Sequence, residues 1–321
     1  MFIQKAFVPG NTFWKYMLGT LLVFLAMLLG QVPMVIAMQV HSMNTGEPLP
    51  MTDTAVYNYL DRNATLFYML LTFVTALAAL LLVVKLLHKQ KLKDIITSRP
   101  RVDWKRVFFA FFIWAVFSLA TTAIDYFSNP ADYVVQFNPG AFLILAVIGI
   151  LMIPLQTSLE ELLFRGYLMQ GFGLLAKNRW VPLVVTSVFF GLLHILNPEV
   201  EKMGYFIIIY YIGTGFLLGI ITLMDEGNEL TLGFHAANNL VAALLVTADW
   251  TAFQTDSVLK DVSEPSAGFD VLVPVLVIYP LLLLLFAKVY KWSNWKEKLT
   301  GKVLPKPVII TEETDTFDTR Y

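Results

Sequence analysis

The sequence of 321 residues contains no cysteine. This absence excludes disulfide frameworks, thiol nucleophiles, iron–sulfur ligation and cysteine-rich zinc sites. Charge is also scarce, since Asp, Glu, Lys and Arg together make up 15% of the residues and the formal net charge is -1. With a pI of about 6.4 the chain has no general basic surface, so we expect no nucleic-acid partner.

Hydrophobic residues, in contrast, make up 57% of the chain, and the mean hydropathy is +0.65. A soluble protein of this size would need more polar residues to cover its surface. Apolar runs about as long as a membrane span recur near residues 16–40, 64–87, 107–127, 140–163, 181–197, 204–224, 231–248 and 269–290. We therefore predict an all-α fold, a polytopic transmembrane helical bundle of about eight spans surrounded by membrane lipid.

Lys and Arg are distributed unevenly over the loops between these runs. Of the 23 Lys and Arg residues, three fall in loops predicted to face outward, namely Arg62, Lys202 and Lys260. Because Lys and Arg favour cytoplasmic loops, we predict a multi-pass protein of the cell membrane with both termini in the cytoplasm. The inner loop 225–230 is an exception, because it contains three acidic residues and no cation.

The sequence divides into three parts. Residues 1–139 contain the N-terminal transmembrane helices and loops, and residues 140–250 form a core in which polar residues interrupt the apolar runs. Residues 251–321 contain the last transmembrane helix and a polar cytoplasmic tail. The stretch after Trp292 is polar and contains TEETDTFDT near its end, a composition that predicts disorder.

Polar residues inside the spans are the strongest functional signal. An ionised side chain at the centre of a span costs about 2.5–3.5 kcal/mol, so such residues need partners and usually have a function. Three groups stand out in the predicted core. They are Glu160, Glu161 and Arg165 in S-L-E-E-L-L-F-R, His194 in F-G-L-L-H, and His235 with Asn239 in H-A-A-N-N.

Helical spacing predicts how the first group is arranged. Glu161 and Arg165 are four residues apart in the favourable acid-before-base order, so they can form an ion pair on one helix face. Glu160 points about 100° away from Glu161 around the helix. We therefore expect Glu160 to face a polar cavity as an uncompensated carboxylate.

The four histidines fall into two classes. His235 lies four residues before Asn239, so both side chains project from one helix face and could donate hydrogen bonds to a single atom. Asn238 is expected to face elsewhere. His41 and His88 lie beside polar residues in predicted loops, and we expect both to be ordinary surface histidines.

Depth along the helices predicts which groups meet. If the chain turns near Lys177, Glu160 lies 17 residues before the turn (177 − 160) and His194 lies 17 residues after it (194 − 177). In an antiparallel pair both would then be about 25 Å from the turn, at the same level. His235 is only five residues past Leu230, which agrees with this level only if the hairpin projects into the cytoplasm.

These three groups in this order, E-E-x-x-x-R, F-x-x-x-H and H-x-x-x-N, resemble the CAAX-protease and bacteriocin-processing family, also called CPBP or Abi. The resemblance covers about residues 140–250. It implies an intramembrane endopeptidase that hydrolyses peptide bonds of a membrane-associated protein or peptide without a cofactor. By the same resemblance, Glu160 would be the catalytic carboxylate and His194 its partner in activating water. His235 and Asn239 would stabilise the oxyanion.

The implied chemistry is physically reasonable. Peptide hydrolysis needs a base for water, an acid for the leaving amine, and donors directed at the tetrahedral oxygen. Glu161 and Arg165 would then support the site by fixing the helix face that carries Glu160.

Two alternatives remain open at this point. Glu160, His194 and His235 could bind a catalytic zinc ion as two histidines and one carboxylate, although the chain has no H-E-x-x-H pair and Asn239 is a poor zinc ligand. The chain could also be non-catalytic, as a bacteriocin-immunity factor or scaffold, or a small transporter that uses Glu160 as a proton site.

Overall fold

A computed structural model of the protein describes residues 1–51, 53–57, 59–265, 268 and 271–305. Of the described residues 74% are helical, which confirms the predicted polytopic helical bundle. The long helices are α1 (Phe13–Gly30), α2 (Val32–Thr45), α4 (Arg62–Leu82), α5 (Trp104–Ser128), α6 (Pro139–Glu161), α7 (Met169–Ala176), α8 (Trp180–Leu193), α10 (Ile208–Asp225), α11 (Glu229–Leu245) and α12 (Tyr279–Tyr290). Shorter helical segments are η1 (Ile3–Ala6), α3 (Asp53–Val56), η2 (Val83–Leu87), η3 (Leu92–Ile95), η4 (Pro130–Asp132), η5 (Leu162–Leu168), η6 (His194–Leu196), α9 (Pro198–Met203), η7 (Tyr205–Ile207), η9 (Pro274–Ile278) and α13 (Trp295–Thr300).

Each of the eight predicted apolar runs coincides with a helical segment of the described chain. Five of these segments are long and apolar enough to cross a membrane, namely Phe13–Thr45, Arg62–Leu87, Trp104–Ser128, Pro139–Ala176 and Tyr205–Asp225. The apolar helices Trp180–Leu196 and Pro274–Tyr290 are shorter, and α11 has 17 residues. These short helices are held by the neighbours against which they pack, so length alone does not define every span.

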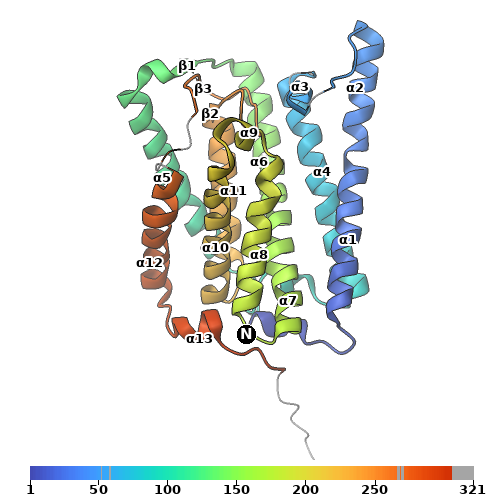
Figure 1. Ribbon diagram of the computed structural model, residues 1–321, viewed down its shortest axis with the longest axis vertical. Helices are drawn as coiled ribbons and strands as arrows, with labels where there is room; N and C mark the ends of the chain where they lie inside the picture. Colours follow the sequence, from blue (N-terminus) through green and yellow to red (C-terminus); the bar gives the residue numbers. More distant parts are fainter. Residues whose placement is uncertain (52, 58, 266–267, 269–270, 306–321) are drawn as a thin grey trace, which may run out of the picture.

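The helices are arranged around α6, α8, α10 and α11 (Figure 1). On one side α4 packs against α1 and α6, and on the other side α5 packs against α11. Between them, α10 packs against α8, and α6 packs against α11. The N-terminal helices therefore share packing with the polar core rather than lying apart from it, and the proposed boundary at residue 139 stays a prediction.

Both ends of the described chain lie at one end of the bundle (Figure 1). The side chain of Gln4 donates to the carbonyl of Leu304 over 2.9 Å, and Asn178 forms an isolated β-bridge with Lys302. The predicted disorder after Trp292 is wrong for residues 295–300, which form α13, whereas residues 306–321 lie outside the described part. The side of the membrane that this end faces stays a prediction from the distribution of Lys and Arg.

A small sheet at the opposite end of the bundle was not predicted (Figure 1). Its strands are β1 (Tyr133–Val135), β2 (Val246–Thr247) and β3 (Leu259–Asp261), in the order β1-β3-β2. β1 pairs with β3 antiparallel, and β2 pairs with β3 in parallel. The sheet joins the loop that follows α5 to the chain that follows α11.

The helix that carries Glu160 is continuous over the 38 residues from 139 to 176. At 1.5 Å per residue it is about 57 Å long, well beyond the roughly 30 Å of a hydrocarbon core. It contains Pro154, and directly after Glu161 it widens into the π-helical segment η5. Such π-helical turns occur frequently at functional sites.

Candidate active site

The structure explains how Glu160 and His235 reach the same depth. A Cβ at Gly166 would lie 2.4 Å from the carbonyl oxygen of Ile95 and 3.3 Å from Nδ2 of Asn228, so the residue before α11 is level with Gly166. Glu160 lies six residues from Gly166, and His235 lies seven residues from Asn228. The hairpin that turns at Lys177 therefore extends beyond the start of α11, as the depth argument requires.

His235 lies between the two adjacent glutamates. Its Nδ1 is 2.8 Å from Oε1 of Glu161, and its Nε2 is 3.4 Å from Oε2 of Glu160. The Glu161 side chain is fully buried, whereas 19% of the Glu160 side chain is exposed. Because an ionised carboxylate only accepts hydrogen bonds, Nδ1 carries a proton toward Glu161, and Nε2 is the nitrogen that faces Glu160.

The predicted ion pair between Glu161 and Arg165 is present. Nη1 of Arg165 lies 3.0 Å from Oε1 of Glu161, and both side chains are fully buried. Nη2 of Arg165 also donates to the carbonyl of Gly215 on α10, and the guanidinium lies 4.0 Å from the centre of the Phe190 ring. Glu161 thus contacts both Arg165 and His235, a link to α11 that spacing within one helix did not reveal.

Among the described residues Glu160 pairs with no Lys or Arg, as the sequence predicted, but its carboxylate is hydrogen-bonded. Its Oε1 accepts a hydrogen bond of 2.7 Å from Nε2 of Gln156, one turn earlier on α6. Oε1 of Gln156 in turn accepts from Nδ2 of Asn239 over 3.1 Å. Sequence reasoning missed Gln156, although its spacing of four residues from Glu160 was a sufficient signal.

His194 ends α8 on the other side of Phe190. Its Nδ1 is 2.8 Å from the carbonyl oxygen of Phe190, and its ring stacks on Tyr211 with centroids 4.3 Å apart. The Phe190 ring centre lies 4.9 Å from that of His194 and 6.1 Å from that of His235. Among the described residues His194 donates no direct hydrogen bond to Glu160, although it lies within electrostatic range of that carboxylate. Since a carbonyl only accepts, Nδ1 carries the proton, and Nε2 of neutral His194 keeps its lone pair.

Asn238 faces α5, in agreement with the prediction that it points elsewhere than His235 and Asn239, but its amide also contacts Asn239. Its Nδ2 donates to Oδ1 of Asn239 over 3.1 Å, and its Oδ1 accepts from the indole Nε1 of Trp114 over 3.0 Å. The reason is that α5 packs closely against α11 and supplies a buried donor on that face. The orientation of the Asn239 amide thus depends on a residue from a third helix.

The zinc hypothesis finds no preformed ligand set in the described part of the chain. No group of three or more His, Asp or Glu side chains among these residues is arranged to hold a metal ion. The zinc ligands considered above, Glu160, His194 and His235, include one histidine whose Nδ1 and Nε2 both face carboxylates. Zinc catalysis remains an alternative that chelation can test.

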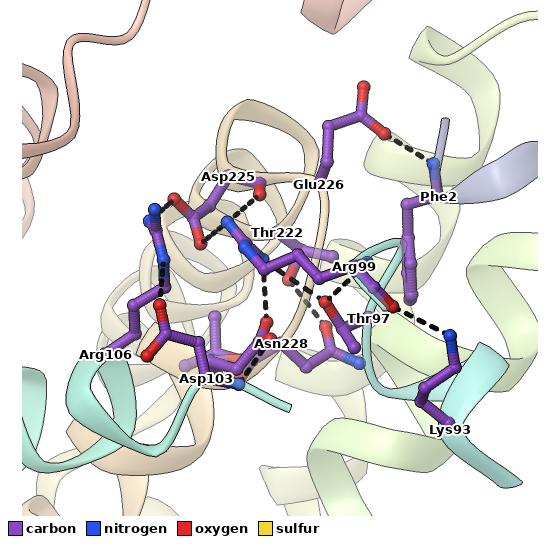
Figure 2. Close-up of polar contacts among 12 residues, drawn as sticks. Phe2, Lys93, Thr97, Arg99, Asp103, Arg106, Thr222, Asp225, Glu226 and Asn228 are labelled. Atoms are coloured by element: carbon purple, nitrogen blue, oxygen red, sulfur yellow. Dashed lines mark hydrogen bonds and ion pairs between the residues drawn. The ribbon is translucent and has the colours of Figure 1, made fainter. Parts of the chain in front are cut away.

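A second charged cluster explains the acidic loop after α10. Figure 2 shows Asp225 paired with Arg99 and Arg106, which come from the loop before α5 and from α5 itself. Arg99 also lies 3.0 Å from the fully buried Glu229. Glu226 accepts from the backbone N–H of Phe2, and it also pairs with Arg179 and Lys298. The acidic loop is therefore neutralised by cations from four other segments of the chain.

The expectation that His88 is a surface histidine is wrong. The residue is 2% exposed, with Nε2 at 2.7 Å from the hydroxyl of Tyr167 and Nδ1 at 3.0 Å from Oδ1 of Asn11. Burial, together with the charge of Lys15, lowers the pKa of His88 to about 4. His41 is not in a loop but in α2, where its Nε2 lies 3.5 Å from a carboxylate oxygen of Glu47.

Comparison with known proteins adds to this geometry. Residues 139–241 match a family described as type II CAAX prenyl endopeptidase Rce1-like. The chain is also 28% identical over 290 residues to the uncharacterized protein YyaK of Bacillus subtilis (strain 168). This alignment covers 90% of this chain and 95% of that protein. No solved structure matches the chain. All three polar groups of the core fall inside the matched segment, so the resemblance inferred from their spacing is confirmed.

Proposed function

We infer from the match of residues 139–241 that this membrane protein is a CAAX-type protease of the Rce1-like family. We propose that it is an intramembrane endopeptidase that hydrolyses a peptide bond of a membrane-associated protein or peptide. The observation that supports this most is that His235 faces Glu160 and that Asn239 is joined to the same carboxylate through Gln156. Carboxylate, imidazole and amide are the groups that hydrolysis of an amide bond requires.

In the proposed reaction Glu160 and His194 activate a water molecule. The water oxygen attacks the scissile carbonyl carbon while Glu160 takes one proton, and Nε2 of His194 is available to accept a hydrogen bond from the same water. Glu160 then gives the proton to the leaving nitrogen as the carbon–nitrogen bond breaks. One product gains a carboxylate, and the other leaves as an amine.

His235 and Asn239 are proposed to stabilise the tetrahedral intermediate. Nδ2 of Asn239 has a second hydrogen beside the one that it donates to Gln156, and Nε2 of His235 donates when the ring is protonated. Donors of this kind are effective because they are already oriented where negative charge develops. Glu161 supports the site by accepting from Nδ1 of His235 and pairing with Arg165.

The proposal predicts a specific change in the N-termini of membrane proteins. In cells that make equal amounts of wild-type protein and of the near-isosteric variant Glu160→Gln, new N-termini seen with the wild type should be missing with the variant. Glu226→Gln is the matched control, because it neutralises a carboxylate of the second charged cluster. An identical set of N-termini in wild type and Glu160→Gln would contradict the proposal and favour a non-catalytic immunity or scaffold role.

A further inference from the structure

A line of hydrogen bonds begins on α5, crosses α11 and ends on Glu160. The indole Nε1 of Trp114 donates to Oδ1 of Asn238 over 3.0 Å, and Nδ2 of Asn238 donates to Oδ1 of Asn239 over 3.1 Å. Nδ2 of Asn239 donates to Oε1 of Gln156 over 3.1 Å, and Nε2 of Gln156 donates to Oε1 of Glu160 over 2.7 Å. Three amide side chains thus join one indole to one carboxylate.

The two ends of this line fix the orientation of every amide in it. An indole N–H only donates, and an ionised carboxylate only accepts. Gln156 must therefore turn its nitrogen toward Glu160, which leaves its oxygen to accept from Asn239. Each amide along the line is constrained in the same way, and flipping any one of them would place two donors or two acceptors against each other.

Burial makes this constraint strong. Gln156 is 3% exposed and Trp114 is 7% exposed, so little water is available to replace a lost partner. A buried polar group that loses its hydrogen bond bears the full cost of desolvation. The arrangement holds Oε1 of Glu160 and leaves Oε2 beside His235, and the side-chain oxygen of Asn239 is occupied by the N–H of Asn238.

We propose that Gln156 and Trp114 are positioning residues for hydrolysis. Trp114 acts through Asn238, and Gln156 acts directly, to orient the Asn239 amide so that its second N–H faces the oxyanion. Gln156 also holds Glu160 in place for water. This inference rests on the proposed function, since it assigns their effect to Glu160 and Asn239. Neither positioning residue contacts the substrate in this scheme.

Gln170 provides a matched control on the same continuous helix. It is fully buried, its Nε2 donates to the carbonyl of Asp94, and its Oε1 accepts from Gln90. It therefore resembles Gln156 in residue type, burial and number of partners. Its partners take no part in the proposed reaction, so a purely structural role would make the two glutamines equivalent.

The first test measures turnover in liposomes with an internally quenched farnesylated peptide that ends in a CAAX sequence. Gln156→Met should lower kcat by about 10–100-fold with KM changed less than about twofold, because an indirect loss is smaller than the roughly 10²–10³-fold loss of an oxyanion donor itself. Trp114→Phe removes the N–H donor but keeps an aromatic ring against Phe234, and it should lower kcat by about 3–10-fold. Gln170→Met should leave kcat per folded molecule unchanged.

The second test introduces a charge at position 156 and measures the ionisation of Glu160. A purely structural role of Gln156 would leave that ionisation unchanged. Gln156→Glu places another carboxylate against Glu160 and disfavours its ionisation, so the acidic limb of the kcat profile should move up by about one pH unit or more. Gln170→Glu should not move it. An infrared titration of the carboxyl band that disappears in Glu160→Gln reports the same shift without any substrate.

The outcomes separate the two proposals. Wild-type kcat in Gln156→Met together with an unmoved Glu160 band in Gln156→Glu would overturn the positioning role while Glu160→Gln still abolishes turnover. If the wild type fails to hydrolyse any membrane peptide but the band moves in Gln156→Glu, the proposed function fails and the coupling between Gln156 and Glu160 stands.

Discussion

The two charged clusters of this protein differ in how their charges are balanced. The bundle core holds two carboxylates, Glu160 and Glu161, and one arginine, Arg165, which forms a fully buried pair with Glu161, while His235 contacts both carboxylates. At the end that holds the termini, four carboxylates face four cations. The carboxylates are Asp103, Asp225, Glu226 and Glu229, and the cations are Arg99, Arg106, Arg179 and Lys298. The balanced cluster joins loops, whereas the core cluster leaves one carboxylate without a cation of its own.

This difference favours the core cluster, rather than the end cluster, as the catalytic site. Retaining an excess carboxylate inside a membrane costs free energy, so its presence favours a task for Glu160. In the end cluster, burial raises the pKa of Glu226, but Lys298, the backbone N–H of Phe2 and Arg179 outweigh burial and hold it below its ordinary value. A carboxylate held ionised in this way stabilises the fold above its ordinary pKa and loses that contribution as the pH falls through its folded-state value.

The largest expected effect comes from removing the single arginine of the core. Arg165→Met leaves Glu161 buried without its cation and should lower the free energy of unfolding by about 3–5 kcal/mol. Arg106→Met should cost only about 1 kcal/mol, because Asp225 keeps Arg99 and the site is partly exposed. Denaturant unfolding in detergent measures both, and equal losses would show that charge balance does not distinguish the clusters.

Two asparagines, Asn228 before the start of α11 and Asn239 within it, allow effects on activity to be distinguished from effects on stability. Asn239→Ala should lower kcat by about 10²–10³-fold, as loss of one oxyanion donor does, and leave substrate affinity little changed. Asn228→Ala removes a fully buried side chain bonded to Ile95 and Thr222, so it should lower stability but not kcat per folded molecule. Turnover assays beside thermal unfolding test this, and a lower kcat in both variants would refute the division.

His88 offers a third environment, a buried histidine whose hydrogen-bond partners, Asn11 and Tyr167, are neutral. Its folded-state pKa of about 4 lies below the ordinary 6.5, so the folded protein binds fewer protons than the unfolded chain between these values. Its contribution to stability is complete above pH 6.5 and falls by up to about 3 kcal/mol as the pH drops toward 4. His88→Gln should flatten this part of the profile of unfolding free energy against pH, whereas His41→Gln should not.

Chelation is expected to have the smallest effect. If Glu160 and His194 activate water directly, exhaustive treatment with a zinc chelator should leave turnover unchanged, and elemental analysis should find no stoichiometric metal. Zinc that is present at one ion per chain, with activity that follows its removal and return, would support zinc catalysis within the same protease.

The sequence predicted features that depend on neighbours along the chain. The apolar runs predicted the helices, and the four-residue spacing predicted the Glu161–Arg165 pair. The equal distances of Glu160 and His194 from Lys177 agreed with a turn at that residue. The four-residue spacing between Gln156 and Glu160 also allowed their contact to be predicted. A neutral side chain inside a span, however, is a weaker functional signal than a charged one. The bond between His235 and Glu161 required knowledge of where α11 begins relative to α6.

Contacts between distant segments were beyond such reasoning. Arg99 is 130 residues from Glu229 and 126 residues from Asp225, so no local pattern connects them. His88 is 77 residues from Asn11 and 79 residues from Tyr167, and only the packed fold reveals that it is buried. The sheet escaped prediction because its strands have only two or three residues.

The most direct test of the central claim is hydrolysis by the purified protein in liposomes prepared in water labelled with ¹⁸O. With an internally quenched peptide that spans a cleavage site found by the comparison of N-termini, the wild type should release a product whose new carboxylate carries one ¹⁸O atom, as attack by water requires. Glu160→Gln should release none, while Glu226→Gln should behave as the wild type. Equal release of labelled product by wild type and Glu160→Gln would contradict the assignment of Glu160 as the catalytic carboxylate.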